Sequence, residues 1–375
     1  MSFLIGADIS SLQAMEDCGA VFYDENGKED DALNILKNHG INSIRLRLFN
    51  DPTLSFDRGD YCNVSNTLPI AKRAKAKGLG IYLDFHYSDF WADWQKQIIP
   101  KAWIGKNVDE LCDAIYKYTL DSLIEFKNNN AWPDIVQIGN EIGRGLLWDY
   151  GTLDHPEYIS RFLNAGIDAV KSISDADYLM PKIMIHIECG AETKQTEDFF
   201  RNLNRYGIGN YDYIGLSYYP YWAGPYEKFI ENAKNAYHVF GKKVIIAETA
   251  FPYTDVSNDD TPNVVTGELT RNTMNMDATP ENQFLALKKI VDIAKSEECI
   301  DGIYYWEPVW YQLKGVGAEK GKGNEWENQA LFDNNGHVLL KSAWFSFLGF
   351  LTGSGLRLMV SLAIVIYYIS SFFHK

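Results

Sequence analysis

The sequence predicts an α/β fold, a single (β/α)8 TIM barrel with an apolar C-terminal helical extension. Two observations lead to this prediction. Short β-branched or apolar runs recur at a regular interval along the 375 residues, and a longer amphipathic stretch follows each run, as in successive βαβ units. A doubly wound open sheet is the alternative, but no G-x-G-x-x-G motif follows the first run.

Eight runs have the composition of buried strands, and we expect strands at residues 3–5, 43–48, 80–85, 135–138, 182–187, 213–217, 243–247 and 302–305. The stretches between them carry apolar residues at helical spacing. We therefore expect helices at residues 30–38, 68–77, 108–127, 156–172, 196–206, 226–240 and 280–298, with a last helix after the eighth strand. Glycine closes three of them, at Gly40, Gly78 and Gly207, as helix C-termini prefer.

Long polar stretches follow the third, seventh and eighth expected strands, at residues 86–105, 251–275 and 307–327. In a barrel these stretches become loops at the carboxyl ends of the strands, where active sites are built. We therefore look for catalytic residues at this end of the barrel.

The charge balance and the cysteines exclude several classes of partner and site. Lys and Arg total 35 against 50 Asp and Glu, a net charge of −15 that repels phosphate backbones and argues against nucleic-acid binding. The five cysteines are scattered and never form a C-x-x-C pair, so neither a disulfide framework nor a zinc knuckle is expected. A neutral or cationic partner fits the composition better.

Two of the expected strands end in a carboxylate. Glu141 follows the run at 135–138, and Glu248 follows the run at 243–247, so both face one barrel mouth once the sheet closes. Carboxyl groups about 5 to 5.5 Å apart carry out retaining glycoside hydrolysis, whereas wider pairs invert. Either residue alone fits a helix cap or a surface loop equally well, but the two together favour a catalytic pair.

Alternation within strands predicts the neighbours of this pair, because residues i and i+2 share a face. Strand two offers Arg45 and Arg47, and a buried arginine near the nucleophilic carboxylate would hold its pKa down. A tyrosine hydroxyl, as of Tyr219 after strand six, would orient that carboxylate. Glu141, in a more apolar setting, would keep the higher pKa that an acid catalyst needs. Arg45 and Asp84 also fit structural ion pairs inside the barrel, and His186 also fits a hydrogen-bonded core histidine.

Aromatic residues gather in the same loops. Flat apolar rings with polar edges suit the C–H faces of sugars, although barrel rims bury tryptophan in any case. The cluster comprises Trp91, Trp94 and Trp103 after strand three, residues 218–222 after strand six, and Trp306 and Trp310 after strand eight.

Several motifs in this order resemble those of glycoside hydrolase family 53, the endo-β-1,4-galactanases. They are DFHYSD at 84–89 with WAD at 91–93, QIGNEI at 137–142, GLSYYPYW at 215–222, AETA at 247–250 and YWEP at 305–308, with GADIS at 6–10 and RLR at 45–47. The resemblance runs from about residue 5 to about residue 338. It implies that Glu141 is the acid/base, Glu248 the nucleophile and Asn140 the partner of the sugar 2-hydroxyl. The substrate-binding candidates are then Arg45, Asp84, His86, Asp89, Trp91, Asn140, His186, Ser217, Tyr219, Trp222 and Trp306.

The chain also departs from the family pattern. The family usually continues Trp-Ala-Asp with Pro-Gly, where this chain has Trp94-Gln95. Bacterial members often bind a structural calcium ion after strand seven through D-x-D-x-H-x-N, and only Asp259 and Asn263 match that pattern here. Asp255 or backbone carbonyls would have to complete the ligand set. We carry forward a calcium site at Asp255, Asp259 and Asn263 as one interpretation, and no cofactor is expected for catalysis.

The resemblance implies a retaining endo-hydrolase of β-1,4-galactosidic linkages in galactan, the arabinogalactan side chains of pectin. The catalytic pair alone does not distinguish it from another β-1,4-glycanase of the same clan, such as a mannanase or cellulase. A non-catalytic carbohydrate-binding barrel is the alternative from another class, and the presence of both acids argues against it. We expect a monomer outside the cell or at its surface. No signal peptide is visible before the first expected strand, so a secretory signal is absent or was removed.

The end of the chain differs from the barrel. Residues 358–373 contain no charge, and as a helix they would cover roughly 24 Å, short of a ~30 Å hydrocarbon core. A membrane span, an interfacial helix and a packed terminal helix all remain open, with membrane contact expected through residues 356–373. We therefore divide the chain into a catalytic barrel, 1–347, and an apolar tail, 348–375.

Overall fold

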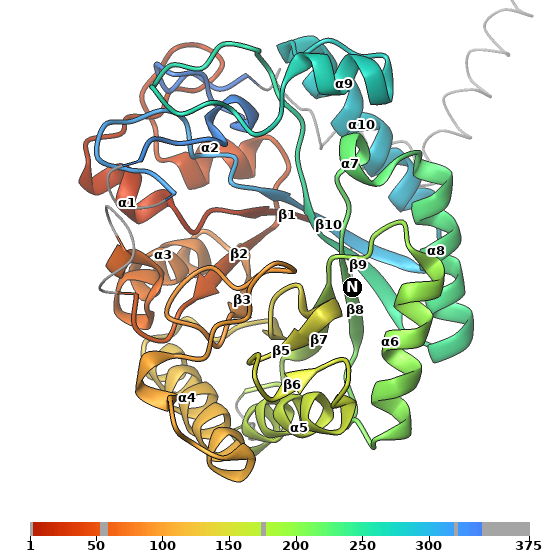
Figure 1. Cartoon of the computed structure of the whole chain (residues 1–375). Coiled ribbons are helices and arrows are strands. Elements are labelled where there is room, and N and C mark those ends of the chain that lie inside the picture. The colour runs from red at the N-terminus through yellow and green to blue at the C-terminus, as the bar shows by residue number, and fades with distance from the viewer. Residues whose placement is uncertain (1–2, 53–58, 174–177, 319–321, 340–375) are drawn as a thin grey trace, which may run out of the picture.

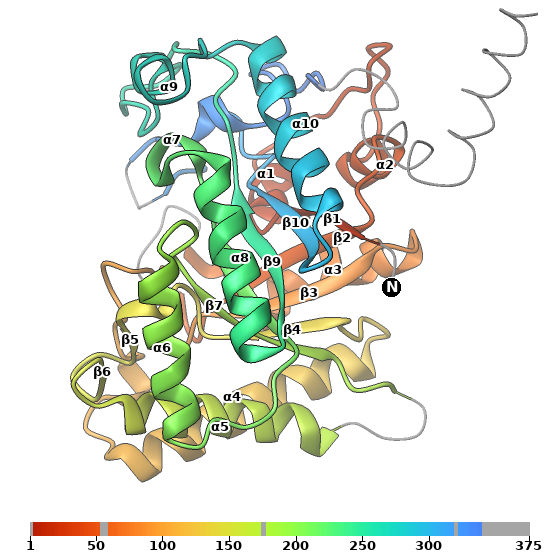
Figure 2. The ribbon, with the colours of Figure 1, turned by 90° about the vertical axis from the view of Figure 1, so that its right-hand side faces the viewer.

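The computed structural model describes residues 3–52, 59–173, 178–318 and 322–339. Eight parallel strands close into a barrel in the order β1-β10-β9-β8-β7-β4-β3-β2, with helices around the outside (Figures 1 and 2). The strands are β1 (Leu4–Asp8), β2 (Ser43–Leu48), β3 (Gly80–Phe85), β4 (Ile135–Ile138), β7 (Lys182–Ile187), β8 (Tyr213–Ser217), β9 (Lys243–Thr249) and β10 (Ile300–Trp306). The predicted (β/α)8 barrel is confirmed.

Several helices begin at a side-chain cap. Asn107 and Glu110 form a reciprocal capping box at the start of α4, and the Thr279 side chain caps α10 ahead of Pro280. The helices are α1 (Leu12–Asp17), α2 (Ala32–Asn38), α3 (Val64–Ala76), α4 (Val108–Asn128), α5 (Pro156–Ile173), α6 (Thr193–Arg205), α7 (Pro220–Ala223), α8 (Tyr226–Phe240), α9 (Gly267–Met274) and α10 (Pro280–Ser296).

The bounds of the expected strands and helices agree with the observed ones to within a few residues. The exceptions are short helices and a hairpin in regions that were expected to be loops. The runs at 43–48, 80–85, 135–138, 182–187 and 213–217 are strands with those bounds. The unpredicted elements are α1, α7, α9 and the hairpin of β5 (Gly145–Leu146) and β6 (Gly151–Thr152). The helix expected after the eighth strand and the apolar tail lie outside the described residues. Within the described part, no helix is long and apolar enough to cross a membrane.

The barrel interior has an apolar floor beneath a polar layer. Tyr82 and Tyr304 meet edge to face in the floor, with ring centroids 4.9 Å apart. Gly6 is required there because a Cβ atom on it would come within 2.1 Å of the Tyr304 ring. The other side chains of this floor are those of Ile135, Met184, Tyr213, Ile245 and Ala247, with Leu4 packed against them.

The polar layer lies two residues further along the strands. Arg45 follows Ser43 on β2, and Asp84 follows Tyr82 on β3, so strand alternation keeps each pair on the inner face. Arg45 and Asp84 are completely buried. The fold thus seals the barrel below with apolar side chains and holds its charged groups at the carboxyl ends of the strands.

Candidate active site

A cleft of about 850 Å³ opens at the carboxyl ends of the barrel strands. Glu141 and Glu248 both line it, at the ends of β4 and β9. Other lining residues that the sequence predicted are His86, Trp91, Asn140, Ser217, Tyr219, Trp222 and Trp306. The structure therefore brings most of the predicted side chains to one concave surface.

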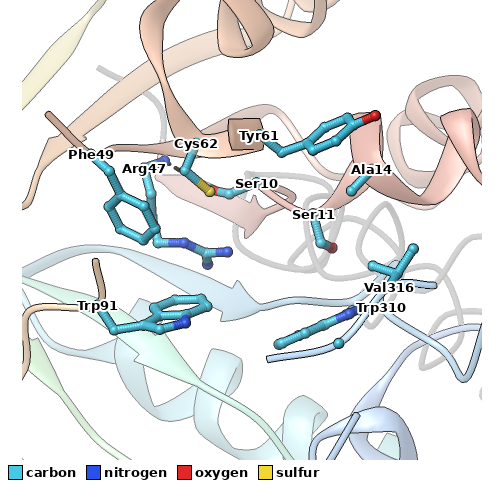
Figure 3. A pocket seen from close by; sticks show the side chains of 11 residues that line it. Ser10, Ser11, Ala14, Arg47, Phe49, Tyr61, Cys62, Trp91, Trp310 and Val316 are labelled. Atoms are coloured by element: carbon cyan, nitrogen blue, oxygen red, sulfur yellow. Dashed lines mark hydrogen bonds between the residues drawn. The ribbon is translucent and has the colours of Figure 1, made fainter. Parts of the chain in front are cut away.

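Arg47 packs against the aromatic side chains of one wall of this cleft. Its guanidinium lies over the rings of Trp91 and Trp306, 4.3 and 5.4 Å from their centroids, and it is hydrogen-bonded to Asp8 and Glu307. Burial raises the pKa of Glu307 to about 7, against the opposing effect of Arg47. Behind the tryptophan wall lies a small cavity of about 40 Å³, into which Arg47 and the neighbouring rings point (Figure 3).

The two acids lie close together. One carboxylate oxygen of Glu141, one of Glu248 and a ring nitrogen of His186 all fall within 4.8 Å of one another. Glu141 has left-handed backbone angles, with φ at 48° and ψ at 50°. A non-glycine residue in this region costs about 1 kcal/mol or more, and such strain clusters at functional sites.

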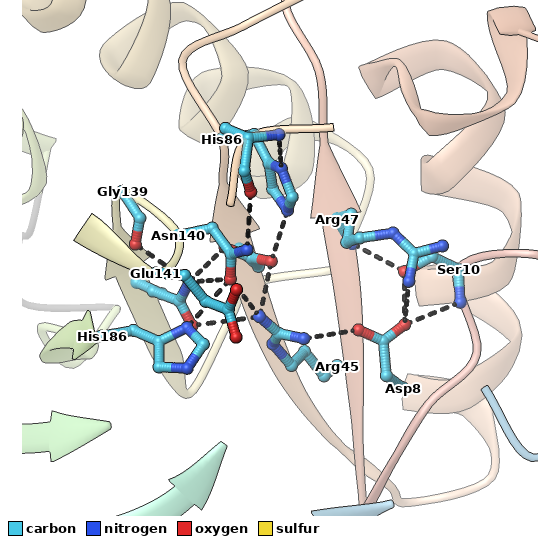
Figure 4. A network of polar contacts seen from close by, with 12 residues as sticks. Asp8, Ser10, Arg45, Arg47, His86, Gly139, Asn140, Glu141 and His186 are labelled. Atoms are coloured by element: carbon cyan, nitrogen blue, oxygen red, sulfur yellow. Dashed lines mark hydrogen bonds and ion pairs between the residues drawn. The ribbon is translucent and has the colours of Figure 1, made fainter. Parts of the chain in front are cut away.

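One guanidinium connects the acids to the polar layer. Arg45 Nη1 donates to Glu248 Oε1 at 2.7 Å and to Asp8 Oδ2 at 2.8 Å. Its Nη2 donates to Asp84 Oδ2 at 2.7 Å and to Asn140 Oδ1 at 2.8 Å. Figure 4 shows Arg45 between Asp8 on one side and the Asn140–Glu141 turn on the other. Arg45 thus fixes the positions of four acceptors from four strands or strand ends.

Glu248 has the surroundings expected of a nucleophile. Its Oε1 accepts from Arg45, and its Oε2 accepts from the Tyr219 hydroxyl at 3.1 Å. Burial raises the pKa of Glu248, and the charge of Arg45 opposes that rise by favouring the carboxylate.

Among the residues that the structure describes, no cation of this kind is hydrogen-bonded to Glu141. Its Oε1 lies 2.6 Å from Ser217 Oγ. Burial and the negative charge of Glu248 raise its pKa well above the ordinary value of 4.5. The pKa is raised in both acids, but Arg45 opposes the rise only at Glu248, and this is the order that an acid and a nucleophile need.

Asn140 and His186 form the layer beneath Glu141. Asn140 Nδ2 donates to the Ala92 carbonyl at 2.9 Å, which leaves Oδ1 to accept from Arg45 and from His186 Nδ1, the latter at 2.9 Å. His186 Nε2 lies 2.9 Å from Ser217 Oγ. His186 is thus both a buried, hydrogen-bonded histidine and a direct neighbour of the site.

His86 has a defined hydrogen-bonding role in the cleft wall. The backbone N–H of Ala92 donates to its Nδ1 at 3.1 Å, so Nε2 carries the hydrogen that points to Asp84 Oδ2 at 3.0 Å. This pair connects the loop after β3 to Arg45 through Asp84.

Asp89 is the predicted site residue that lies apart from the others, outside the set of described residues lining the cleft. Its carboxylate accepts from Asn50 Nδ2 at 3.1 Å and from the backbone N–H groups of Asp51 and Lys101 at 3.0 and 2.7 Å. In this position it braces two loops against each other.

Several residues lining the cleft were not predicted, and Trp326 and Glu188 are two of them. Trp326 packs edge to face on Trp306 with centroids 4.6 Å apart, and Glu188 Oε2 accepts from the Gly143 N–H at 3.0 Å. Glu188 directly follows β7, so the carboxylate-after-strand signal that identified Glu141 and Glu248 also applies to it. Trp326 lies far along the last loop, where no strand pattern indicates its direction.

The residues proposed for calcium have other partners. Asp259 accepts through both oxygens, from the N–H of Thr261 at 2.7 Å and from that of Asn324 at 2.8 Å. Asp255 accepts from the Gly267 N–H and lies 3.6 Å from the Arg271 guanidinium. Asn263 Oδ1 finds no partner among the described residues, but one free amide oxygen does not make a calcium site. This set does not fit the ion, and no catalytic step is assigned to it.

Comparisons with known proteins agree with this geometry. Residues 4–345 match the profile described as Glycosyl hydrolase family 53. The chain is 36% identical over 340 residues to the arabinogalactan endo-beta-1,4-galactanase of Cellvibrio japonicus, covering 88% of this chain and 86% of that protein.

Solved structures give the same result. The Ignisphaera aggregans GH53 catalytic domain superposes with a TM-score of 0.86 at 37% identity, covering 92% of this chain and 95% of that one. A structure from a study of two fungal β-1,4-galactanases superposes with a TM-score of 0.79 at 30% sequence identity. The match covers 92% of this chain and 99% of that one. The predicted family resemblance is confirmed, and the chain belongs to glycosyl hydrolase family 53.

Proposed function

We propose that this glycoside hydrolase cuts internal β-1,4-galactosidic linkages of galactan, the side chains of type I arabinogalactan in pectin, with retention of configuration. The observation that carries the proposal is the pair of Glu141 and Glu248. One oxygen of each carboxylate lies within 4.8 Å of the other, which fits the close carboxyl pair of a retaining enzyme better than the wider pair of an inverting one. The names of the relatives support galactan as the substrate.

In the first step, Glu248 Oε2 or Oε1 attacks the anomeric carbon as a carboxylate while the glycosidic bond breaks. Glu141 gives its proton to the departing oxygen, so the leaving sugar carries a free hydroxyl. Arg45 and Tyr219 hold the Glu248 carboxylate in place for this attack. The product of the step is a galactosyl ester of Glu248.

In the second step, water replaces the departed sugar. Glu141, now a carboxylate, takes one hydrogen of the water as its oxygen attacks the anomeric carbon, and the ester bond to Glu248 breaks. Two displacements at one carbon restore the original β configuration. No metal or cofactor enters either step.

The aromatic walls support binding of a polysaccharide. Trp222 is half exposed and lines the cleft, and Trp306 and Trp326 pack edge to face against each other in its lining. Their ring faces offer stacking surfaces to sugars. The name of the Cellvibrio japonicus relative, an endo-beta-1,4-galactanase, supports cleavage within the polysaccharide chain.

Sugar release from β-1,4-galactan, β-1,4-mannan and β-1,4-glucan tests the substrate assignment. We expect release from galactan alone, and activity confined to mannan or glucan would support the rival glycanases. The Glu248→Ala variant should abolish cleavage. Wild-type protein that binds galactan without cutting it would instead support the carbohydrate-binding barrel.

We further propose that the protein is a monomer outside the cell or at its surface, with membrane contact through residues 356–373. The motivation is the uncharged sequence of 358–373, which lies outside the described residues. Detergent-free solubility should increase when the chain is ended near residue 348. Equal solubility of the two forms would count against membrane contact.

A further inference from the structure

A continuous chain of polar contacts runs beneath Glu141. Asn140 Oδ1 lies 2.9 Å from His186 Nδ1, His186 Nε2 lies 2.9 Å from Ser217 Oγ, and Ser217 Oγ lies 2.6 Å from Glu141 Oε1. The members come from the end of β4, from β7 and from β8. All four side chains are nearly or fully buried.

The direction of the first hydrogen bond is fixed by Arg45. A guanidinium can only donate, so the Asn140 atom 2.8 Å from Arg45 Nη2 must be the amide oxygen. The amide nitrogen of Asn140 meanwhile donates to the Ala92 carbonyl. His186 Nδ1 therefore faces an acceptor and must carry a hydrogen.

His186 has no second hydrogen to give. The ring is fully buried, and burial together with the positive charge of Arg45 lowers its pKa well below 6.5, so it is neutral. With the hydrogen on Nδ1, the Nε2 atom of a neutral imidazole can only accept. Its partner at 2.9 Å is Ser217, whose hydroxyl must therefore donate to it.

This assignment uses the only hydrogen of Ser217. The 2.6 Å contact between Ser217 Oγ and Glu141 Oε1 then needs a hydrogen from the other side, and only a protonated Glu141 supplies one. With Glu141 ionised, Ser217 would turn its hydrogen to the carboxylate, and the lone pairs of His186 Nε2 and Ser217 Oγ would face each other. The network is complete only when Glu141 is an acid.

We propose that His186 and Ser217 are positioning residues that store the catalytic proton on Glu141, an inference that rests on the proposed function. When the proton passes to the departing glycosidic oxygen, the Glu141–Ser217 bond loses its hydrogen. Ser217 then turns its own hydrogen from His186 to the new carboxylate. When Glu141 takes a hydrogen from the attacking water, the resting arrangement returns.

Ser217 is uncharged, so Ser217→Ala adds no charge to the groups around this chain and removes none. Glu141 faces Glu248 on β9, Glu188 after β7 and Asp93 in the loop after β3. His186 faces Arg45 on β2, and Asp84 and His86 on and after β3. A change at Ser217 therefore reports on the hydrogen-bond chain against a constant electrostatic background.

The Ser217→Ala variant tests the proposal by the direction in which the pH profile moves. The acid must be protonated, so its pKa sets the basic limb of the pH profile of kcat/KM on galactan. If Ser217 accepts from Glu141, its removal destabilises the acid form and moves the basic limb down by about half to one pH unit. If Ser217 instead donates to a carboxylate, its removal moves the limb up, which would overturn the proposal.

Two further variants distinguish the loss of this hydrogen bond from a structural disturbance of the site. Ser217→Thr keeps the hydroxyl and should keep the wild-type position of the basic limb. His186→Asn keeps a donor toward Asn140 but removes the acceptor for Ser217, so the limb should move down as in Ser217→Ala. A Ser217→Thr limb displaced as far as that of Ser217→Ala would contradict the proposal.

The protonation of His186 can be measured without any catalysis. Heteronuclear NMR of the wild-type histidine rings, with the His186 signal identified by its loss in His186→Asn, should give a neutral ring with its hydrogen on Nδ1. A hydrogen on Nε2, or on both nitrogens near neutral pH, would overturn the proton-storage chain. Absence of galactan cleavage would overturn the proposed function, and this measurement would still decide the arrangement of hydrogens.

Discussion

Arg45 Nη1 donates a 2.7 Å hydrogen bond to Glu248 Oε1, and both groups are buried. The same guanidinium also contacts Asp8 and Asp84, so it lies in contact with three carboxylates in the barrel. Removing one partner of a buried ion pair costs about 3–5 kcal/mol, because the remaining charges lose their compensation. The position and ionisation of Glu248 therefore depend on a residue that does not line the cleft.

Replacing Arg45 with Gln should raise the pKa of Glu248, because the charge that favours the carboxylate is lost. The nucleophile must be ionised, so the acidic limb of the kcat/KM profile should move to higher pH, with activity at the optimum down by about 100-fold or more. Arg73→Gln, which removes a partly exposed arginine paired with Glu16, is the matched control and should keep the wild-type profile. An unchanged acidic limb in Arg45→Gln would contradict this role, and Arg45→Lys offers the same test if the Gln variant does not fold.

Tyr219 and Tyr218 form a matched pair of neighbours with different partners. The Tyr219 hydroxyl donates to Glu248 Oε2, whereas the Tyr218 hydroxyl donates to the Gly224 carbonyl at 2.7 Å. Hydrogen bonds to charged groups are worth about 1.5–3 kcal/mol, so Tyr219→Phe should lower kcat by about 10- to 100-fold. Tyr218→Phe should leave kcat within about twofold of the wild type. Equal kcat losses in the two variants would show that the Tyr219 hydroxyl has no special effect on Glu248.

Glu141 should reduce the stability of the fold at neutral pH. Its pKa is raised in the folded state, so the folded protein holds this proton more tightly than the unfolded chain, and stability falls as pH rises above 4.5. Glu141→Gln keeps the shape and a donor toward Ser217, and should raise Tm at pH 7 by about 1–3 °C. At pH 4 the gain should shrink, because Glu141 is then protonated in both states. A variant less stable than wild type at pH 7 would be evidence against the raised pKa.

Metal removal should leave the protein unchanged. The carboxylates of Asp255 and Asp259 already accept backbone N–H groups, which organise the loop after β9. We expect Tm and galactan cleavage to be the same in EDTA and in excess calcium, within about 1 °C and within error. A calcium-dependent rise in Tm of several degrees would demonstrate the ion site that the sequence left open.

The sequence predicted the barrel and most of the site because both follow from local rules. Apolar runs of strand length define the sheet, and side chains two residues apart share a face, which places Arg45 and Asp84 in the interior. The same rule fails at Glu248. Ile245 and Ala247 point into the barrel, so strict alternation would turn Glu248 outward, but the register between β8 and β9 shifts at Ser217 and turns it to the cleft.

The remaining positions depend on contacts between distant loops. Asp89 lies in a predicted motif, yet the backbone of Asp51 and Lys101 binds its carboxylate and holds it away from the cleft. Trp326 reaches the cleft because it packs on Trp306, a contact that no periodicity encodes. The role of His186 follows from the direction of its hydrogen bonds, which requires the positions of its neighbours.

The covalent intermediate on Glu248 is the most direct test of the central claim. A galactosyl or galactobiosyl donor with fluorine at C2 and an activated leaving group should form the ester and slow its hydrolysis, so that it accumulates. Mass spectrometry of the digested protein is predicted to find one added glycosyl group on the peptide that contains Glu248, and none in the Glu248→Ala variant. An adduct on another residue, or turnover of galactan whose newly formed ends appear first as the α anomer, would contradict a retaining mechanism with Glu248 as nucleophile.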